Sequence, residues 1–378
     1  MNRWRAENFS AVELNSTGNQ ELTPFFSIAV TTYDRRDLLK QTLESITSQT
    51  FSDFEVIIGN DNHQEPLSAG LLGIADPRIR LVNNPQNLGE LENMNSLLRM
   101  SRGRYFTWQS DDDLYAPDFL EAVHSALVKF DFPRCVFTSY KTIDGTSARR
   151  VAKSFSGQQQ LLSFSGRQFL RMYLSGKLKA MGCTGVMDIE YIRQMGGVKR
   201  LSESPFALYA EYVLLLHAGL QENIAYINAP LVFYRDHEGS WGCTSRDVDE
   251  FKQAGQNLVH HSVTVFKRPE LRDHFYQNLS SILELPLSVL VSKLAARDGR
   301  VNKHEVMAYL LSLREQFKPL KGSVLYWLAL AGLGRRGVGL VWSAAKSEFR
   351  SAAPPGLVKL ARRLRSFLPG RERRPFWN

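Results

Sequence analysis

Along the first third of the chain, short apolar runs alternate with longer segments in which apolar side chains recur every three or four positions. The runs at 25–31, 54–59 and 79–82 are typical of buried parallel strands. The segments at 36–49 and 87–100 gather their apolar side chains on one side of a helix. Strands that alternate with helices in this way predict an α/β domain with a parallel sheet, in which each strand ends in a polar loop.

The next apolar run, at 105–108, leads directly into three consecutive carboxylates, Asp111, Asp112 and Asp113. Like charges so close repel one another, and a cation among them would make the arrangement tolerable. Oxygen ligands of this kind suit Mg²⁺ or Mn²⁺. The acids also follow a predicted strand at its carboxyl end, where open α/β sheets bind their ligands. A solvated acidic turn is the alternative interpretation.

The second half of the chain reads as helical. Amphipathic patterns at 247–266, 271–295 and 301–317 predict helices. A further helix at 357–368 has six apolar residues on one face and four basic residues opposite, a design that lies on anionic membranes. A nucleic-acid-binding tail is a rival interpretation, but an apolar stripe serves no phosphate contact and no recognition motif accompanies it. A helix docked on its own domain or on a partner is a third.

The composition is that of an ordinary globular protein. A chain of 378 residues with 43% hydrophobic side chains can bury the core of one large domain and a smaller one. The net charge of +9 resides in residues 335–378, which hold eleven Lys and Arg against two Glu. Three widely spaced cysteines favour a reducing compartment, and no apolar stretch reaches the length of a membrane span. We therefore expect a cytoplasmic protein whose membrane contact is at most peripheral, on the inner face.

Several short motifs follow one another along the chain. They are SIAVTTYDR at 27–35, QTLESITSQTFSDFEVIIGNDN at 41–62, NLG at 87–89, Asn95, GRY at 103–105, DDDLYAPDFLE at 111–121 and YRDHEGS at 234–240. Their order over about two thirds of the chain resembles a family 2 glycosyltransferase of the GT-A fold. The resemblance implies a Rossmann-like α/β catalytic domain at 24–242 after an extension at 1–23. A helical region at 243–351 and the basic amphipathic tail at 352–378 would follow.

By this resemblance the protein transfers a sugar from a nucleotide diphosphate donor to an acceptor hydroxyl with inversion. We expect a UDP-sugar first, a hexosyl or N-acetylhexosaminyl group, and a glycan or lipid-linked acceptor of surface polysaccharide biosynthesis, with no nucleic acid. A divalent cation, Mn²⁺ or Mg²⁺, would neutralise the leaving diphosphate, with Asp112 and His237 as its ligands. The division of labour between Asp111 and Asp112 stays open, because Ser110 stands where the family carries its first aspartate. A surface histidine is the alternative for His237.

The resemblance also assigns donor recognition to the loops after the first two strands. The ring of Tyr33 could stack on the base, while the Thr32 backbone and Asp61 could bond base or ribose edges. Gly89 would permit close approach of the backbone to the donor. The full set of expected donor-binding residues is Thr32, Tyr33, Asp34, Asp61, Asn87, Gly89, Asn95, Asp111 and Arg235. For Asp34, capping of the following helix is the alternative role.

The family places its catalytic base in an acidic pair at the start of a late helix, and Glu211 in the predicted helix at 207–219 is the acid in that position. A half-buried carboxylate there would have its pKa raised toward the working range. A solvent-facing helical glutamate is the alternative. A catalytically lapsed nucleotide-sugar-binding or scaffold protein is the rival to an enzyme, because Ser110, Asn60 and Tyr212 depart from the family pattern.

Overall fold

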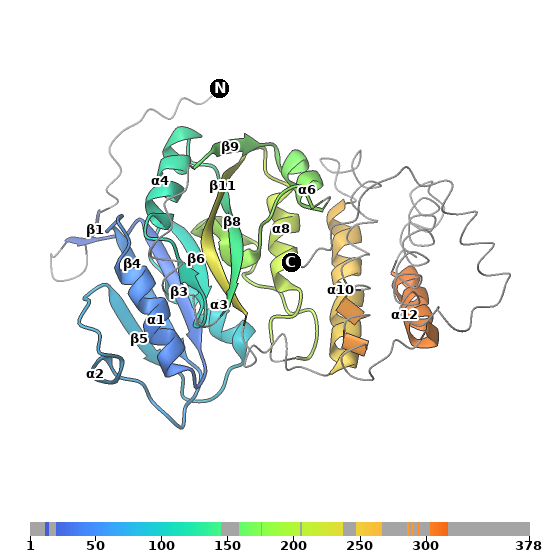
Figure 1. The fold of residues 1–378 in the computed structure, drawn as a ribbon, viewed down its shortest axis with the longest axis horizontal. Helices are drawn as coiled ribbons and strands as arrows, with labels where there is room; N and C mark the ends of the chain where they lie inside the picture. Colours follow the sequence, from blue (N-terminus) through green and yellow to red (C-terminus); the bar gives the residue numbers. More distant parts are fainter. Residues whose placement is uncertain are drawn as a thin grey trace.

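The computed structural model describes residues 12–14, 20–144, 159–174, 176–204, 206–236, 247–266, 286, 289–290, 293–294 and 303–316. Within these residues, nine strands form one mixed sheet with helices on both faces (Figure 1). The order across the sheet is β5 (Ile79–Asn83), β4 (Phe54–Asn60), β3 (Phe26–Thr32), β6 (Tyr105–Ser110), β10 (Gly185–Asp188), β8 (Cys135–Asp144), β11 (Ile224–Asp236) and β7 (Leu114–Tyr115), and β9 (Leu161–Phe164) pairs with β11.

The first half of the sheet is parallel. Strand β3 pairs in parallel with β4 and β6, and β4 pairs in parallel with β5. The connections contain α1 (Arg36–Thr47), the short α2 (Ala69–Leu72) and α3 (Glu90–Met100). The predicted parallel α/β arrangement is therefore confirmed, and the carboxyl ends of β3, β4 and β6 meet at one edge.

The second half of the sheet is mixed. Strand β10 runs antiparallel to both β6 and β8, whereas the long β11 runs parallel to β8 and antiparallel to β7 and β9. The β11–β8 register shifts on both sides of Pro230, where a proline cannot donate to the ladder. Beyond the shift, β11 passes the aspartates that follow β6.

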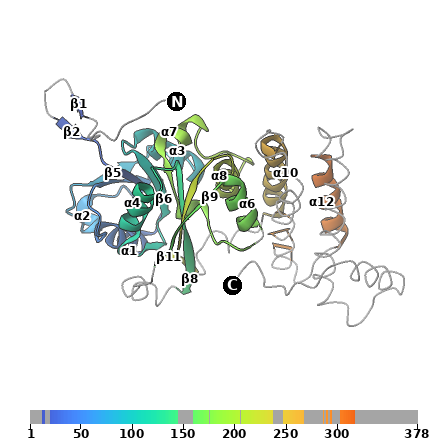
Figure 2. The ribbon, with the colours of Figure 1, turned by 90° about the horizontal axis from the view of Figure 1, so that it is seen from above.

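Two hydrophobic clusters lie on the two faces of the sheet. Helices α1 and α4 (Phe119–Lys129) cover one face, and α3, α6 (Gly166–Leu174), α7 (Ile189–Gln194) and α8 (Ala210–Ala218) cover the other (Figure 2). Side chains alternate between the clusters along β3: Ile28 and Val30 pack toward α1, and Ala29 packs on the opposite face. The strands are thus buried on both sides, as their continuous apolar runs predict.

Two of the predicted carboxyl-terminal helices are present, as α10 (Val248–Phe266) and α12 (Lys303–Glu315) (Figure 1). Phe251 and Leu258 of α10 and Tyr309 of α12 belong to the same hydrophobic cluster as α8. The Asn257 side chain also donates to the Leu201 carbonyl at 2.7 Å. The helical region therefore extends the core on that face of the sheet.

Other predictions fall on parts of the chain that the structure describes incompletely. Most of the predicted helix at 271–295 and the whole amphipathic tail at 352–378 lie outside the described residues. Within the expected extension at 1–23, β1 (Val12–Leu14) and β2 (Gln20–Leu22) form an antiparallel pair. None of the helices among the described residues is long and apolar enough to cross a bilayer.

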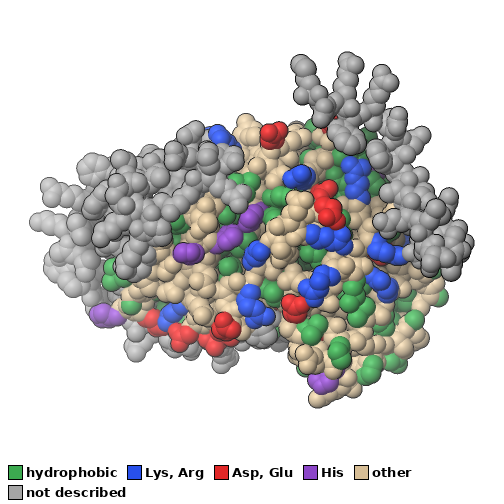
Figure 3. All heavy atoms as spheres, turned by 180° about the vertical axis from the view of Figure 1, so that it is seen from behind, with side chains coloured by type: hydrophobic (Ala, Val, Ile, Leu, Met, Phe, Trp, Pro, Cys, Tyr) green, Lys and Arg blue, Asp and Glu red, His purple; other side chains and the backbone are tan. Residues whose placement is uncertain are grey.

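The surface seen from behind carries charges of both signs. Lys and Arg side chains on this face lie beside Asp and Glu side chains instead of forming an uninterrupted basic area (Figure 3). This agrees with the balanced charge of the sequence outside residues 335–378.

Candidate active site

The turn after β6 is held in place by a polar stripe on helix α1. The hydroxyl of Thr42, which is buried, donates to the carbonyls of Asp111 at 2.9 Å and Asp113 at 2.8 Å. One helical turn after Thr42, the Ser45 hydroxyl accepts from the Tyr115 amide. Just after the helix, the Gln49 side chain donates to the Ala116 carbonyl. These bonds supplement the β7–β11 pairing and satisfy backbone groups of the turn, so the three aspartates have a fixed position.

The three aspartate side chains point to different partners. Asp111 accepts from the Thr32 hydroxyl at 2.7 Å, and Asp113 accepts from the backbone amide of Arg235 in β11 at 2.8 Å. Of the two aspartates that pair with Arg35, Asp112 is the more accessible: its side chain is 11% exposed, against 4% for Asp111. Asp113 therefore joins β6 to β11, and Asp112 is the carboxylate that a ligand can reach.

A guanidinium lies between the two accessible acids. Nη1 of Arg35 is 2.9 Å from Oδ2 of Asp112 and 3.3 Å from Oδ1 of Asp111. Burial, with the negative charge of Asp112, raises the pKa of Asp111 to about 6, while Thr32 and Arg35 oppose this rise. Burial also raises the pKa of Asp113 well above its usual range, and Asp112 adds to the effect. Negative charge on these buried carboxylates is therefore disfavoured, and a cation bound among them would relieve the penalty.

The loop that precedes α3 is built on Asp61. Its Oδ1 accepts from the Leu88 amide at 2.8 Å and from the Asn84 side chain at 3.0 Å, and its Oδ2 accepts from the Gly89 amide at 2.8 Å. Gly89 has φ 78°, in the left-handed region that favours glycine. Asn87 bonds the same Gly89 amide from a neighbouring turn. Asp61 thus positions the loop and brings its backbone to the carboxyl edge of the sheet.

Across from the aspartates, Glu211 stands in the first turn of α8. The Gly182 amide donates to its Oε2 at 3.0 Å, and Gly182 leaves no room for a side chain, since a Cβ would lie 2.8 Å from Cγ of Glu211. Burial raises the pKa of Glu211; the Gly182 amide lowers it, and the charge of Glu90 raises it further. The residue before the helix, Tyr209, is a cap in the left-handed region. The structure thus holds a half-buried carboxylate of raised pKa, as the sequence predicts.

Glu90 lies between the two groups of acids. It opens α3 and accepts from the Ala207 amide at 3.1 Å, which joins the start of α3 to the segment before α8. Desolvation raises the pKa of Glu90, and the charge of Asp112 adds to the rise. The charge of Asp112 thus reaches Glu90, and the charge of Glu90 reaches Glu211.

The remaining expected site residues lie in different places. Tyr33 is 53% exposed beside the site, where its ring is open to stacking, and Asp34 has φ 55° in the turn that leads into α1. Asn95 faces away from the aspartates and bonds both backbone groups of Val198. Arg235 is only 2% exposed, with its Nη1 bonded to Gln41. His237 lies outside the described residues.

Sequence reasoning missed Arg35 and Glu90. Arg35 ends one expected motif and Glu90 follows another, but their partners lie 76 or more residues away in the chain. Polar residues at Thr42 and Ser45, beside the leucines of the same helix, and at Gln49 just after it were the available signal for the support of the turn. Such polar residues on a buried helix indicate that the backbone of another segment needs partners.

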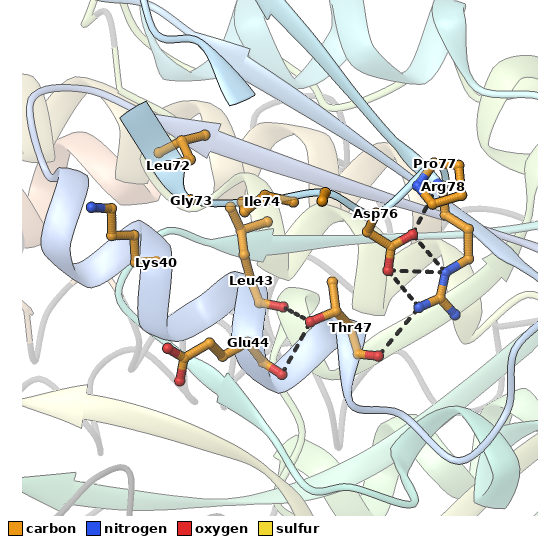
Figure 4. Close-up of a pocket in the computed structure, with 11 residues that line it drawn as sticks. Lys40, Leu43, Glu44, Thr47, Leu72, Gly73, Ile74, Asp76, Pro77 and Arg78 are labelled. Atoms are coloured by element: carbon orange, nitrogen blue, oxygen red, sulfur yellow. Dashed lines mark hydrogen bonds and ion pairs between the residues drawn. The ribbon is translucent and has the colours of Figure 1, made fainter. Parts of the chain in front are cut away.

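A separate hollow of about 550 Å³ opens between α1 and the loop that precedes β5. Figure 4 shows Arg78 at one end, bonded to Asp76 and to the Thr47 carbonyl, with Lys40 at the other end. The Arg78 guanidinium therefore fastens the loop to α1. The charged groups of this hollow lie apart from the carboxylates described above.

The sequence around this site was compared with models of known protein families. Residues 27–188 match the family model described as glycosyl transferase family 2. Within these residues the chain resembles a family 2 glycosyltransferase domain. The matched residues include β3, α1, β4, the Asp61 loop, the three aspartates and β10.

Several curated relatives are named as glycosyltransferases. An uncharacterized glycosyltransferase of Haemophilus influenzae (strain ATCC 51907 / DSM 11121 / KW20 / Rd) is 30% identical over 29% of this chain and 35% of its own length. A second one from that strain is 26% identical over 72% of this chain and 87% of its own length. A relative of Escherichia coli (strain K12), WcaA, is named as a candidate colanic acid biosynthesis glycosyl transferase and is 31% identical over 26% of this chain and 36% of its own length. The chain spans about a third of the length of the first curated relatives that it matches.

Solved structures confirm the fold of this glycosyltransferase. TarS residues 1–349 of S. aureus match with a TM-score of 0.56 at 12% identity, over 85% of this chain and 91% of that one. The same protein in complex with UDP-GlcNAc matches with a TM-score of 0.55 at 11% identity, over 85% and 92%. The mixed sheet with its helices is thus a GT-A-type fold.

Proposed function

We propose that this chain is an inverting, metal-dependent glycosyltransferase that moves a sugar from a nucleoside diphosphate sugar to an acceptor hydroxyl. The observation that supports the proposal is the fixed position of Asp111 and Asp112 at the carboxyl edge of a domain that matches family 2, together with Glu211 held by the Gly182 amide. That edge is where sheets of this class bind ligands. The acids differ in environment, which suits them to different tasks.

A divalent cation fits the residues at Asp112. Oδ1 of Asp111 and Oδ2 of Asp112 converge on one cationic nitrogen, an environment that an oxygen-preferring ion would also satisfy. Asp112, with Asp111 beside it, would hold the ion, and His237 stays a proposed further ligand. When bound, such an ion neutralises the charge that grows on a departing diphosphate. Among the described residues, no cluster of three His, Cys, Asp or Glu side chains forms a metal site by itself.

Glu211 would act as the general base. The acceptor oxygen forms a bond to the anomeric carbon while the bond from that carbon to the phosphate oxygen breaks, and the electron pair leaves with the diphosphate. Glu211 takes the proton of the acceptor hydroxyl, and its raised pKa brings it nearer to the working pH. Attack from the face opposite the leaving group gives inversion. The Gly182 amide keeps the carboxylate in place.

The other expected residues would serve the donor. Tyr33 offers an exposed ring for the base, and the Thr32 and Asp34 segment lines the same edge. Asp61 would act mainly through the loop that it holds, which contains Asn87 and Gly89. The buried Arg235 would support Asp113, and Asn95 would anchor the loop at Val198. These two residues thus contribute from outside the donor space.

Names of relatives guide the choice of substrates. TarS was solved with UDP-GlcNAc and with UDP, which favours a UDP-sugar with a hexosyl or N-acetylhexosaminyl group. The WcaA name favours surface polysaccharide or lipid-linked glycan synthesis. The basic stretch at 352–378 would hold the enzyme on the anionic inner face of the membrane, near a lipid-linked acceptor.

A panel of nucleotide sugars tests the proposal. We expect release of nucleoside diphosphate from at least one donor and loss of that release in Asp112→Asn and in excess chelator. Asp131→Asn is the matched control, because Asp131 is exposed in a turn after α4 and asparagine tolerates its φ of 59°. Full turnover by Asp112→Asn, with a melting temperature equal to that of the wild type, contradicts the role of Asp112.

A further inference from the structure

Arg35 occupies the place where a cation would bind. Its Nη1 lies within 3.3 Å of both Asp111 and Asp112, and its side chain is 28% exposed, so it covers the two acids from the solvent side. It precedes the first turn of α1, directly after Asp34, whose φ of 55° turns the chain at the end of β3. The guanidinium thus comes from the same loop that is expected to meet the donor.

Two carboxylates with little solvent need compensation for their charge. Arg35 supplies it together with the Thr32 hydroxyl, and the charge-assisted bonds are of the stronger kind. A divalent ion and a guanidinium cannot share the same two oxygen atoms, since they repel each other at such distances. Binding of one at Asp111 and Asp112 must therefore weaken binding of the other.

We propose that Arg35 is a built-in cation that competes with the divalent ion for Asp111 and Asp112 and yields its place when a nucleoside diphosphate enters. This inference rests on the metal dependence put forward above. The freed guanidinium meets the phosphates, which it can bind through two parallel donors. The donor then strengthens binding of the divalent ion in two ways: it offers oxygen ligands, and it draws Arg35 away from the acids.

The neighbouring arginine shows what an ordinary surface pair looks like. Nη2 of Arg36 is 3.9 Å from Oε2 of Glu65, and both side chains are largely exposed. Pairs of this kind contribute little. Arg36 is therefore the matched control for Arg35, with the same charge at the next position of the chain.

The competition predicts how strongly the binding of UDP and the binding of Mn²⁺ are coupled. In the wild type, UDP should raise the affinity for Mn²⁺ strongly, because it removes Arg35 from the acids. In Arg35→Gln the guanidinium is already absent from the acids, so UDP should raise the Mn²⁺ affinity by a smaller factor. By linkage, Mn²⁺ should raise UDP affinity by the same smaller factor in the variant.

The test is a titration of the full chain with Mn²⁺, followed by the loss of the free-ion electron paramagnetic resonance signal, with and without UDP. Without UDP, Arg35→Gln should bind Mn²⁺ about tenfold more tightly than the wild type, the effect of losing a charge-assisted pair. Arg36→Gln should match the wild type, and Arg35→Lys should stay close to it because an ammonium also competes. Circular dichroism melts establish that each variant is folded.

Equal or weaker Mn²⁺ binding by folded Arg35→Gln overturns the inference, and so does an unchanged effect of UDP. If Arg35→Gln does not fold, Arg35→Met carries the same test, since it also removes the charge, and an Mn²⁺ affinity and UDP effect equal to those of the wild type overturn the inference. Donor turnover in chelator separates the two proposals: turnover that persists without metal contradicts the metal dependence, whereas metal-dependent turnover with unchanged Mn²⁺ affinity contradicts only the role of Arg35.

Discussion

Asp111, Asp112 and Asp113 follow one another in the chain but meet three different environments. Asp113 accepts from the Arg235 amide, Asp111 from the Thr32 hydroxyl, and Asp112 pairs with Arg35 at 2.9 Å. Identical side chains thus acquire different chemistry from partners on β3 and β11. The same principle applies to Glu211, whose pKa is set by burial, by the Gly182 amide and by Glu90.

The pH dependence of the reaction follows from Glu211. The base must be ionised to accept a proton, so kcat/KM should fall as the pH drops through a pKa above the ordinary glutamate value. Glu90→Gln removes a negative charge that raises this pKa, so the acidic limb of the profile should move to lower pH. Glu92→Gln, at an exposed pair with Arg99, is the control and should leave the limb in place. A limb that stays fixed or moves upward in Glu90→Gln contradicts this electrostatic link.

At the residue scale, local signals could predict the acids but not all of their partners. The strand before Asp111 and the helix that carries Glu211 are visible as patterns of apolar residues. The contacts of Arg35 with Asp111 and of Glu90 with Ala207 join distant segments, which spacing along one segment cannot reveal. Asn95 shows the converse, since a motif position bonds Val198 instead of facing the aspartates.

Helix α1 illustrates the element scale, because it has a buried polar stripe beside its apolar one. The sequence predicts the leucine stripe, and Leu39 and Leu43 are indeed buried against the sheet. Thr42 and Ser45 of α1, with Gln49 just after the helix, instead supply partners to the backbone between Asp111 and Leu120. Helix α1 therefore sets the position of the acids through the backbone.

Thr42→Val tests this role of the helix. The change keeps the shape of the side chain and removes the donor shared by two buried carbonyls, so it should lower the free energy of unfolding by about 1–3 kcal/mol. Turnover should fall further than the small loss of folded protein explains. Thr47→Val is the control, because its hydroxyl bonds only carbonyls of its own helix. Equal turnover in the two folded variants would show that the turn keeps its position without Thr42.

At the scale of the whole molecule, the sheet and the carboxyl-terminal helices share one core. The predicted parallel half is regular because each strand is an uninterrupted apolar run, whereas β11 contains Asn228 and Pro230, which hide it from pattern reading. Amphipathic faces predict α10 and α12 but not what they pack against; in the structure α10 packs on α8, and α12 packs on α10. Glu211 therefore stands on a helix fixed from both sides, by the sheet and by α10.

The most direct test of the account compares donor binding and donor turnover in the wild type and in Glu211→Gln. The substitution keeps the size of the side chain and its acceptor for the Gly182 amide but removes the proton acceptor. Calorimetry should show unchanged donor affinity, while release of nucleoside diphosphate should slow by about 10²-fold or more. Undiminished turnover by Glu211→Gln would contradict the account. So would a wild type that binds a donor and turns over none, the behaviour of a lapsed nucleotide-sugar-binding protein.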